Sequence, residues 1–225
     1  MLDAVLFDLD GTLADTMPSL VFCVNRTRAQ FGLDPVSPDT VLECVGLGER
    51  DFVRGGITEE TIAERGEAFF EEAYLFYKSF YKEHATYLTG PYAGITAALD
   101  TLRARELRLG IVSNKAHEFV TEMAEMLFPG RFSAVVGVGE LPPKPDPAPA
   151  IEAARMMGVQ PRRCAFVGDS EIDMETAKNA GMIPLGVSWG YRPPLSLQNA
   201  GALAIAEAPN DLATLIGLCE KGLLL

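Results

Sequence analysis

One stretch near the start of the chain, Ala4-Val5-Leu6-Phe7-Asp8-Leu9-Asp10-Gly11-Thr12, decides the fold and carries two candidate functional residues. Its four leading apolar residues do not alternate with polar ones, which is typical of a strand buried on both faces in a parallel sheet. Asp8 and Asp10 follow directly, and Gly11 permits a sharp turn by which both carboxylates can reach a crevice. Two acids at the end of a buried strand have no evident packing role, so the stretch predicts a functional site at the sheet edge.

Further short apolar runs predict the remaining strands of the sheet. Helical segments lie between most of them, at Ile95 to Glu106, Pro147 to Met157 and Glu171 to Ala180, with the residue signals typical of helix starts and ends. This alternation predicts an α/β fold with a doubly wound, mostly parallel sheet. The expected strands are Ala4 to Phe7, Leu109 to Val112, Ala134 to Val138, Cys164 to Val167, Ile183 to Val187 and, more weakly, Ala202 to Ile205.

Residues 15–86 interrupt this alternation. The segment holds no convincing strand, whereas Met17 to Phe31 and the aromatic-rich Thr58 to Glu83 both show helical periodicity. A long helical insertion after the first strand predicts a second, all-α domain. We therefore expect an α/β core at 1–14 and 87–225 and a helical cap at 15–86.

Composition and charge exclude several classes of protein. Hydrophobic residues make up 48% of the chain and charged residues 22%, a balance typical of folded domains. The net charge of −12 argues against nucleic acid or an anionic membrane as partner. No apolar stretch approaches the roughly 20 residues that span a bilayer, the N-terminus lacks a basic signal region, and the cysteines form no CxxC pair. We expect a cytoplasmic monomer or homodimer that binds a small molecule.

Polar residues follow the expected strands at the places where parallel sheets bind ligands, outside the strands' carboxyl ends. Ser113-Asn114-Lys115 follows the second strand, Lys144 lies between two prolines after the third, and Gly168-Asp169-Ser170-Glu171-Ile172-Asp173 follows the fourth. Taken singly, Ser113 fits a turn residue, Lys144 a solvated lysine and Asp173 a helix-start carboxylate. Their joint occurrence with the two leading acids favours a functional site.

These motifs resemble those of the haloacid dehalogenase-like hydrolases. The stretch 7–13 looks like the first motif of that family, and Ser113, Lys144 and the 168–173 segment match its other three motifs in order. The resemblance covers essentially the whole chain and places a small helical cap where residues 15–86 lie. Ser113-Asn114-Lys115, 144–147 and 186–191 look most like the phosphoglycolate phosphatase branch.

The residue chemistry fits phosphoryl transfer. Asp8 can attack phosphorus to form an aspartyl-phosphate, and Asp10 can protonate the leaving oxygen and later activate water. The resemblance implies Mg²⁺ bound by the Asp8 carboxylate, the Asp10 backbone carbonyl and Asp169, with Asp173 as a further ligand or an orienting residue.

The phosphoryl oxygens need donors of their own. Ser113, the backbone N–H of Asn114 and the ammonium of Lys144 are the expected donors. Lys115, next to Asn114 in the sequence, adds a second positive charge near the expected phosphate-binding residues. In the cap, Arg50 and Arg54 are candidates for binding a substrate carboxylate, with Arg50 expected on a flexible loop at 46–50; an ordinary surface role fits them equally well.

The resemblance therefore implies a Mg²⁺-dependent phosphatase acting on a small phosphorylated metabolite, with phosphoglycolate as the leading substrate. Asp10 separates the phosphotransfer members of the family from the dehalogenases, which lack it. A sugar phosphomutase of the β-phosphoglucomutase kind and an inorganic pyrophosphatase stay open as alternatives. A non-catalytic interaction module is disfavoured by the complete set of motif residues.

Overall fold

The computed structural model describes residues 1–46 and 48–224. The chain divides into two compact units. Unit 1 contains Met1–Asp15 and the chain from Pro91 onward, and unit 2 contains Thr16–Gly90.

Unit 1 is built on a six-stranded sheet in the order β5-β4-β1-β6-β7-β8, with every neighbouring pair parallel. The α/β fold with a doubly wound parallel sheet expected from the sequence is confirmed, and all six strands overlap the predicted runs. A separate two-stranded sheet pairs β2 with β3. The strands are β1 (Ala4–Phe7), β2 (Ala14–Asp15), β3 (Gly90–Pro91), β4 (Arg108–Ala116), β5 (Ala134–Val138), β6 (Cys164–Gly168), β7 (Ile183–Val187) and β8 (Ala204–Ala206).

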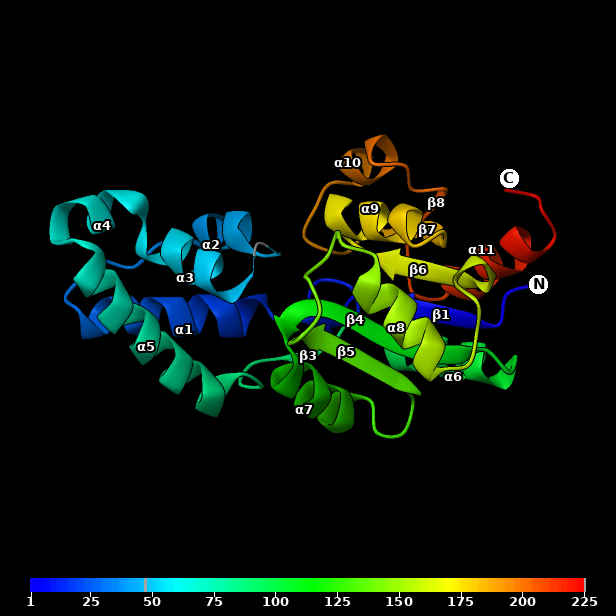
Figure 1. The fold of residues 1–225 in the computed structure, drawn as a ribbon, viewed down its shortest axis with the longest axis horizontal. Helices are drawn as coiled ribbons and strands as arrows, with labels where there is room; N and C mark the ends of the chain where they lie inside the picture. Colours follow the sequence, from blue (N-terminus) through cyan, green and yellow to red (C-terminus); the bar gives the residue numbers. More distant parts are fainter. Residues whose placement is uncertain (47, 225) are drawn as a thin grey trace. The chain divides into compact units, whose positions relative to one another are not determined.

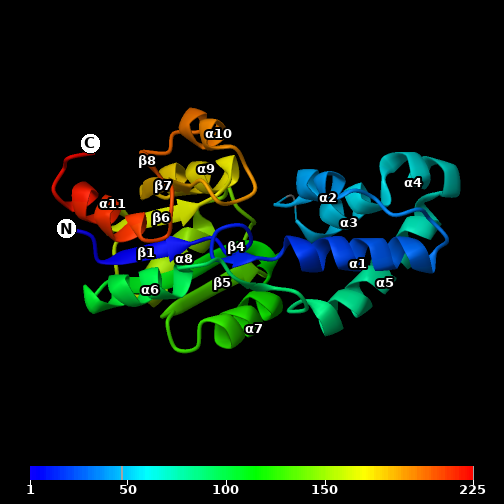
Figure 2. The same ribbon diagram turned by 180° about the vertical axis from the view of Figure 1, so that it is seen from behind.

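Helices cover both faces of the six-stranded sheet. Helices α8 and α9 lie over one face (Figure 1), and α6 and α11 pack together over the other (Figure 2). Helix α7 packs on β4 and β5, and α10 packs near β7 and β8. The elements are α6 (Ile95–Ala104), α7 (His117–Leu127), α8 (Ala148–Met156), the 3₁₀ turn η1 (Pro161–Arg163), α9 (Glu171–Asn179), α10 (Pro194–Asn199) and α11 (Asp211–Glu220).

The core beneath α8 shows why this helix lies close to the sheet. Three alanines on α8, Ala150, Ala153 and Ala154, are completely buried against a cluster that contains Leu6 of β1 and Phe166 of β6. Small helix side chains let the larger strand residues fill the space between the layers at normal interior density. This packing fixes the central strand β1, which Asp8 and Asp10 follow.

Strand β4 carries an irregularity where it reaches its carboxyl end. Val112 pairs with Val136 and Ala116 pairs with Val138. Between these two pairs, four residue steps along β4 correspond to only two along β5. The residues between, 113–115, therefore bulge out of the ladder. Bulges of this kind redirect side chains and are common beside functional sites.

Gly137 of β5 makes room for that bulge. A Cβ atom at this position would lie 2.6 Å from the Cα of His117, 2.7 Å from the carbonyl oxygen of Lys115 and 2.8 Å from the nitrogen of His117. These are backbone atoms, which cannot rotate away. The path of the β4 bulge therefore requires glycine at position 137 of β5.

The described residues of unit 2 form five helices, and two expectations about this unit are wrong. The single helix expected at Thr58 to Glu83 is two helices, because the backbone turns at Gly66 with φ of +89°. Arg50, expected on a flexible loop, lies in the first turn of α3; Leu47 of that loop lies outside the described residues. The helices are α1 (Met17–Gln30), α2 (Pro38–Cys44), α3 (Glu49–Ile57), α4 (Glu59–Arg65) and α5 (Glu67–His84).

Within residues 1–46 and 48–224, no helix has both the length and the apolar character required to cross a bilayer.

We predict that Gly137→Ala lowers the free energy of unfolding of unit 1 by about 1–3 kcal/mol, the usual cost of overpacking a rigid interior. Urea unfolding followed by the fluorescence of Trp189, the single tryptophan and part of unit 1, measures the change. Gly139→Ala is the matched control, since nothing lies within 4 Å of its Cβ position. Equal stability of the two variants would contradict the role given to Gly137.

Candidate active site

Asp8 and Asp10 follow the end of β1, the central strand of the sheet. β1 is flanked by β4 and β6, and the N–H of Asp8 continues the ladder by donating to the carbonyl of Val167 at 2.9 Å. The chain then folds into a tight loop in which the N–H groups of Leu13 and Ala14 both donate to the carbonyl of Leu9 at 3.0 Å. This loop holds Asp8 and Asp10 at the edge where the chains of β4 and β6 also end.

A buried ion-pair network links Asp8 to residues from two other loops. The Nζ atom of Lys144 lies 2.9 Å from Oδ1 of Asp8 and 2.6 Å from Oδ1 of Asp173. The side chains of Lys144 and Asp173 are 3% and 0% exposed. The other oxygen of Asp173 accepts bonds from the Ser170 hydroxyl at 2.6 Å and the Ser170 N–H at 3.0 Å.

Asp173 therefore has two structural partners at once. It completes a capping box with Ser170 at the start of α9, and it holds the ammonium of Lys144 between itself and Asp8. The helix-start interpretation of this residue and the functional one are both compatible with the geometry, because each uses a different carboxylate oxygen.

Asp169 is held by groups from the first loop and from the segment after β7. Its Oδ1 accepts a bond of 2.7 Å from the Thr12 hydroxyl, and its Oδ2 accepts one of 2.8 Å from the N–H of Tyr191. The indole N–H of Trp189 donates to the carbonyl of Thr12 at 3.0 Å, which ties the two segments together. The orientation of the carboxylate is thus fixed from both sides.

Two glycines are required for this close packing around Asp169. Gly11 has φ of +80°, and a Cβ atom on it would collide with the Asp169 carboxylate. A Cβ atom on Gly190 would collide with the Asp169 side chain and lie 2.6 Å from the carbonyl oxygen of Gly11. No side chain larger than hydrogen fits at either position without movement of the site.

The charges of Asp8, Asp169, Asp173 and Lys144 do not balance one another. Burial raises the pKa of Asp8; the Lys144 ammonium opposes this shift, and Asp173 and Asp10 add to it. Burial and the charges of Asp173 and Asp8 likewise raise the pKa of Asp169. Burial by itself would lower the pKa of Lys144, but Asp173 and Asp8 raise it above its ordinary value, so the lysine stays charged. Among these four side chains the three carboxylates share a single ammonium, which contacts Asp8 and Asp173.

The same three carboxylates have the arrangement of a metal site. One oxygen atom from each of Asp8, Asp169 and Asp173 lies within 4.8 Å of the others. The buried Oδ1 of Asp8 accepts no well-directed hydrogen bond from the described residues, although the Lys144 ammonium is close to it. A hard divalent cation bound by oxygen atoms would satisfy that atom and neutralise the excess charge. The residues therefore fit a metal of this class.

The bulge of β4 contributes three residues with three different contacts. The hydroxyl of Ser113, which is 5% exposed, accepts a bond from the N–H of Lys115 at 3.3 Å. The Asn114 side chain forms a reciprocal pair with the backbone of Lys144, donating at 3.0 Å and accepting at 2.7 Å. The Nζ of Lys115 contacts both carboxylate oxygens of Asp10, at 2.8 and 3.0 Å.

Some of these contacts were not foreseen from the sequence. The Asn114 side chain positions the Lys144 loop, whereas only its N–H was expected to act. Thr12 and Tyr191 hold Asp169, and Lys115 holds Asp10. Thr12 and Tyr191 do lie in stretches already singled out, 7–13 and 186–191, so proximity to a motif was the available signal.

The two arginines considered for substrate binding belong to unit 2. Arg50 is ion-paired with Glu71 and lies over the rings of Phe70 and Tyr74. Arg54 pairs with Glu59 at 2.6 Å and with Glu67 at 2.8 Å. Each guanidinium thus has partners within unit 2, and the specificity role of both residues stays a prediction.

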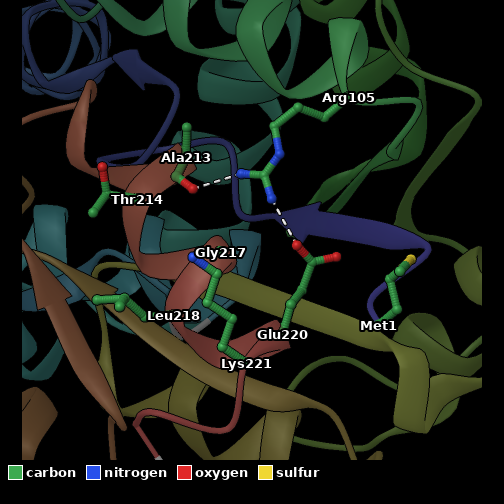
Figure 3. A pocket seen from close by; sticks show the side chains of 8 residues that line it. All are labelled: Met1, Arg105, Ala213, Thr214, Gly217, Leu218, Glu220 and Lys221. Carbon is green, nitrogen blue, oxygen red and sulfur yellow. Dashed lines mark hydrogen bonds and ion pairs between the residues drawn. The ribbon is translucent and has the colours of Figure 1, made fainter.

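A pocket of about 540 Å³ lies elsewhere in unit 1, along α11 (Figure 3). Arg105 projects into it and donates to the carbonyl of Ala213 at 2.6 Å and to Glu220 at 2.7 Å. Glu220 in turn accepts a bond from the N–H of Leu2. These bonds fasten the C-terminal helix to the core, and the residues that line the pocket do not include Asp8, Asp10, Asp169 or Asp173.

The site so assembled contains the parts needed for covalent catalysis with proton transfer. Asp8 is a carboxylate beside a buried ammonium, and Asp10 is a second carboxylate two residues away. A hydroxyl, an ammonium and backbone N–H groups at the strand ends are donors suited to an anionic group.

Comparisons with known proteins agree with this chemistry. Residues 5–187 match the family model described as haloacid dehalogenase-like hydrolase. A phosphoglycolate phosphatase of Chromobacterium violaceum is 35% identical, with 97% of each chain covered. An N-acetylmuramic acid 6-phosphate phosphatase of Pseudomonas aeruginosa is 32% identical over 97% of each chain. A crystal structure assigned as a phosphoglycolate phosphatase, from Lactobacillus delbrueckii subsp. bulgaricus, has a TM-score of 0.86 at 30% identity and covers 96% of this chain and 99% of that chain.

We predict that Mg²⁺ binding releases protons and weakens as the pH falls through the raised pKa values of Asp8 and Asp169. A proton on either carboxylate competes with the cation, so affinity is highest where both are ionised. Calorimetric titration in two buffers of different ionisation enthalpy measures the released protons. Asp169→Asn should weaken binding at least about tenfold. A pH-independent affinity with equal heats in both buffers would rule out this metal site.

Proposed function

Because the chain belongs to the haloacid dehalogenase-like hydrolase family, we propose that it is a Mg²⁺-dependent phosphatase that hydrolyses small phosphomonoesters through an aspartyl-phosphate on Asp8. The enzyme is a phosphoric monoester hydrolase, and phosphoglycolate is its leading substrate. The observation that carries the proposal is the pair Asp8 and Asp10 at the end of the central strand, with each carboxylate facing a different lysine.

The first chemical step transfers the phosphoryl group to the protein. A carboxylate oxygen of Asp8 attacks phosphorus, and the bond from phosphorus to the ester oxygen breaks. The leaving oxygen keeps the electron pair of that bond and takes a proton from the carboxyl group of Asp10. The products of this step are the free alcohol and an aspartyl-phosphate.

The second step returns Asp8 to its starting state. A water molecule gives a proton to the Asp10 carboxylate and attacks phosphorus with its oxygen. The bond between phosphorus and the Asp8 oxygen breaks, which releases inorganic phosphate and leaves Asp10 protonated for the next cycle. One carboxyl group thus serves as acid and then as base.

The remaining residues bind and orient. Lys144, Ser113 and the N–H of Asn114 bind the phosphoryl oxygens, and Asp173 with the Asn114 side chain keeps Lys144 in place. Asp8, Asp169 and the Asp10 carbonyl would hold Mg²⁺, with Asp173 as a ligand or an orienting residue. When bound, the cation supplies positive charge that offsets the repulsion between the carboxylates and a phosphate dianion.

Two relatives bear on the choice of substrate. The 35% identical phosphoglycolate phosphatase supports a small carboxylate-bearing ester. The N-acetylmuramic acid 6-phosphate phosphatase, at 32% identity, favours a sugar phosphate as the second candidate. Both are phosphomonoesters, so the proposed chemistry is the same for either.

A phosphate-release assay with and without Mg²⁺ tests the proposal. We expect release from phosphoglycolate or, as second candidate, N-acetylmuramic acid 6-phosphate, and loss of activity in EDTA with recovery on adding Mg²⁺. β-Glucose 1-phosphate and pyrophosphate belong in the same panel. Isomerisation of the sugar phosphate without phosphate release would indicate a mutase, and preferred cleavage of pyrophosphate would indicate a pyrophosphatase.

We predict that Asp8→Asn abolishes turnover, because a neutral amide cannot form the aspartyl-phosphate. Its free energy of unfolding in the absence of Mg²⁺ should stay equal or rise, since the change removes one of the crowded carboxylates whose pKa burial has raised. Circular dichroism and urea unfolding check the fold. Asp100→Asn, which breaks only an exposed pair with Arg131, is the control and should keep full activity. Near-wild-type turnover by Asp8→Asn would overturn the assignment of the nucleophile.

A further inference from the structure

We propose that Lys115 is a positioning residue that fixes the carboxylate of Asp10 for its proton transfers. The inference rests on the proposed function, because it concerns the group that acts as acid and base in that reaction. It gives a role to the third residue of the β4 bulge.

The contact between the two side chains is close and nearly buried. The ammonium of Lys115 lies 2.8 Å from Oδ1 and 3.0 Å from Oδ2 of Asp10, so both carboxylate oxygens are held at once. The lysine side chain is 8% exposed and the aspartate side chain 13%. Holding both oxygens restricts rotation of the carboxylate, and shielding from water makes a charge-assisted bond stronger than a surface ion pair.

The backbone delivers Lys115 to this position. The bulge between Val112 and Ala116 carries residues 113–115 out of the β4 ladder, and Gly137 lets the Lys115 carbonyl approach β5. The ammonium is therefore anchored on a strand end rather than on a free loop. A site built on rigid elements holds its groups more accurately than one on a mobile segment.

The two lysines of the site have separate tasks. Lys144 contacts Asp8 and Asp173, whereas Lys115 contacts Asp10. Asp10 must direct its carboxyl group first at the leaving oxygen and then at the attacking water. A positioned acid or base contributes about 10²–10⁴-fold to rate, and a displacement of about 1 Å can remove a factor of 10².

The chromogenic substrate p-nitrophenyl phosphate separates this role from phosphate binding. Its leaving group departs without a proton, so the first step does not need Asp10, while hydrolysis of the aspartyl-phosphate does. In rapid-mixing experiments, Lys115→Met should keep the first-turnover burst of p-nitrophenolate. Its steady-state rate should fall by about 10- to 100-fold with little change in KM. Acid quenching should show accumulated aspartyl-phosphate.

Two further variants sharpen the test. If Lys115 acts only through Asp10, adding Lys115→Met to Asp10→Asn should lower the rate no further, because the two effects are not additive. Lys178→Met replaces an exposed lysine on α9 and should behave as wild type. Loss of the burst, a large rise in KM, an unchanged steady-state rate, or an additional loss in the Asp10→Asn background would each overturn the proposal.

A structural readout keeps this inference separate from the proposed function. Crystals of the wild-type chain should show Asp10 held by Lys115, and crystals of Lys115→Met should show the Asp10 carboxylate turned to another rotamer. An unmoved carboxylate would refute the positioning role whatever the activity. If the wild-type chain hydrolyses no phosphomonoester, the proposed function fails, while the comparison of Asp10 rotamers still decides the role of Lys115.

Discussion

The mutual repulsion of three closely spaced carboxylates, one after β1 and two after β6, is the constraint on which the rest of the site depends. Asp8, Asp169 and Asp173 bring their oxygens within 4.8 Å of one another, in surroundings that raise the pKa of Asp8 and Asp169. Several neighbouring groups reduce this repulsion. Lys144 is buried between two of the acids, donors from Thr12 and Tyr191 stabilise the third, and the start of α9 provides a hydroxyl and an N–H for Asp173. The negative charge that remains is the charge that a divalent cation would offset in the proposed reaction.

The pattern of hydrophobic residues predicted the strands of unit 1 well, because a strand buried on both faces appears in the sequence as a continuous apolar run. The predicted bounds of β1, β5 and β7 agree with the structure to the residue. The rule that parallel strands end at one edge also explains why Asp8, Ser113 and Asp169 could be grouped before any coordinates were known. The catalytic, phosphate-binding and metal-binding roles given to these residues stay predictions, to be decided by the experiments above.

The sequence was less informative where a local choice depends on distant partners. The helical segment expected at 58–83 included Gly66 without a break, so periodicity alone did not separate α4 from α5; the positive φ of that glycine does. Arg50 follows two glycines and looked like a loop residue, yet α3 begins at Glu49. Thr12 meets Asp169 across 157 residues of chain, and Lys115 meets Asp10 across 105. Contacts of that kind depend on rotamers and loop paths that no local pattern encodes.

The position of β1 in the sheet also has a consequence for biosynthesis. Ala4 pairs with Arg108 on one side and with Cys164 on the other, so the earliest-translated strand of this sheet gains both neighbours only once β6 has been translated. All of unit 2 is synthesised before either partner strand exists. Until then β1 is an apolar segment with unpaired edges, the kind of segment that chaperones protect in nascent chains. A chain released before β6 is translated would contain Asp8 but lack Asp169, Asp173 and one of the two strands that flank β1.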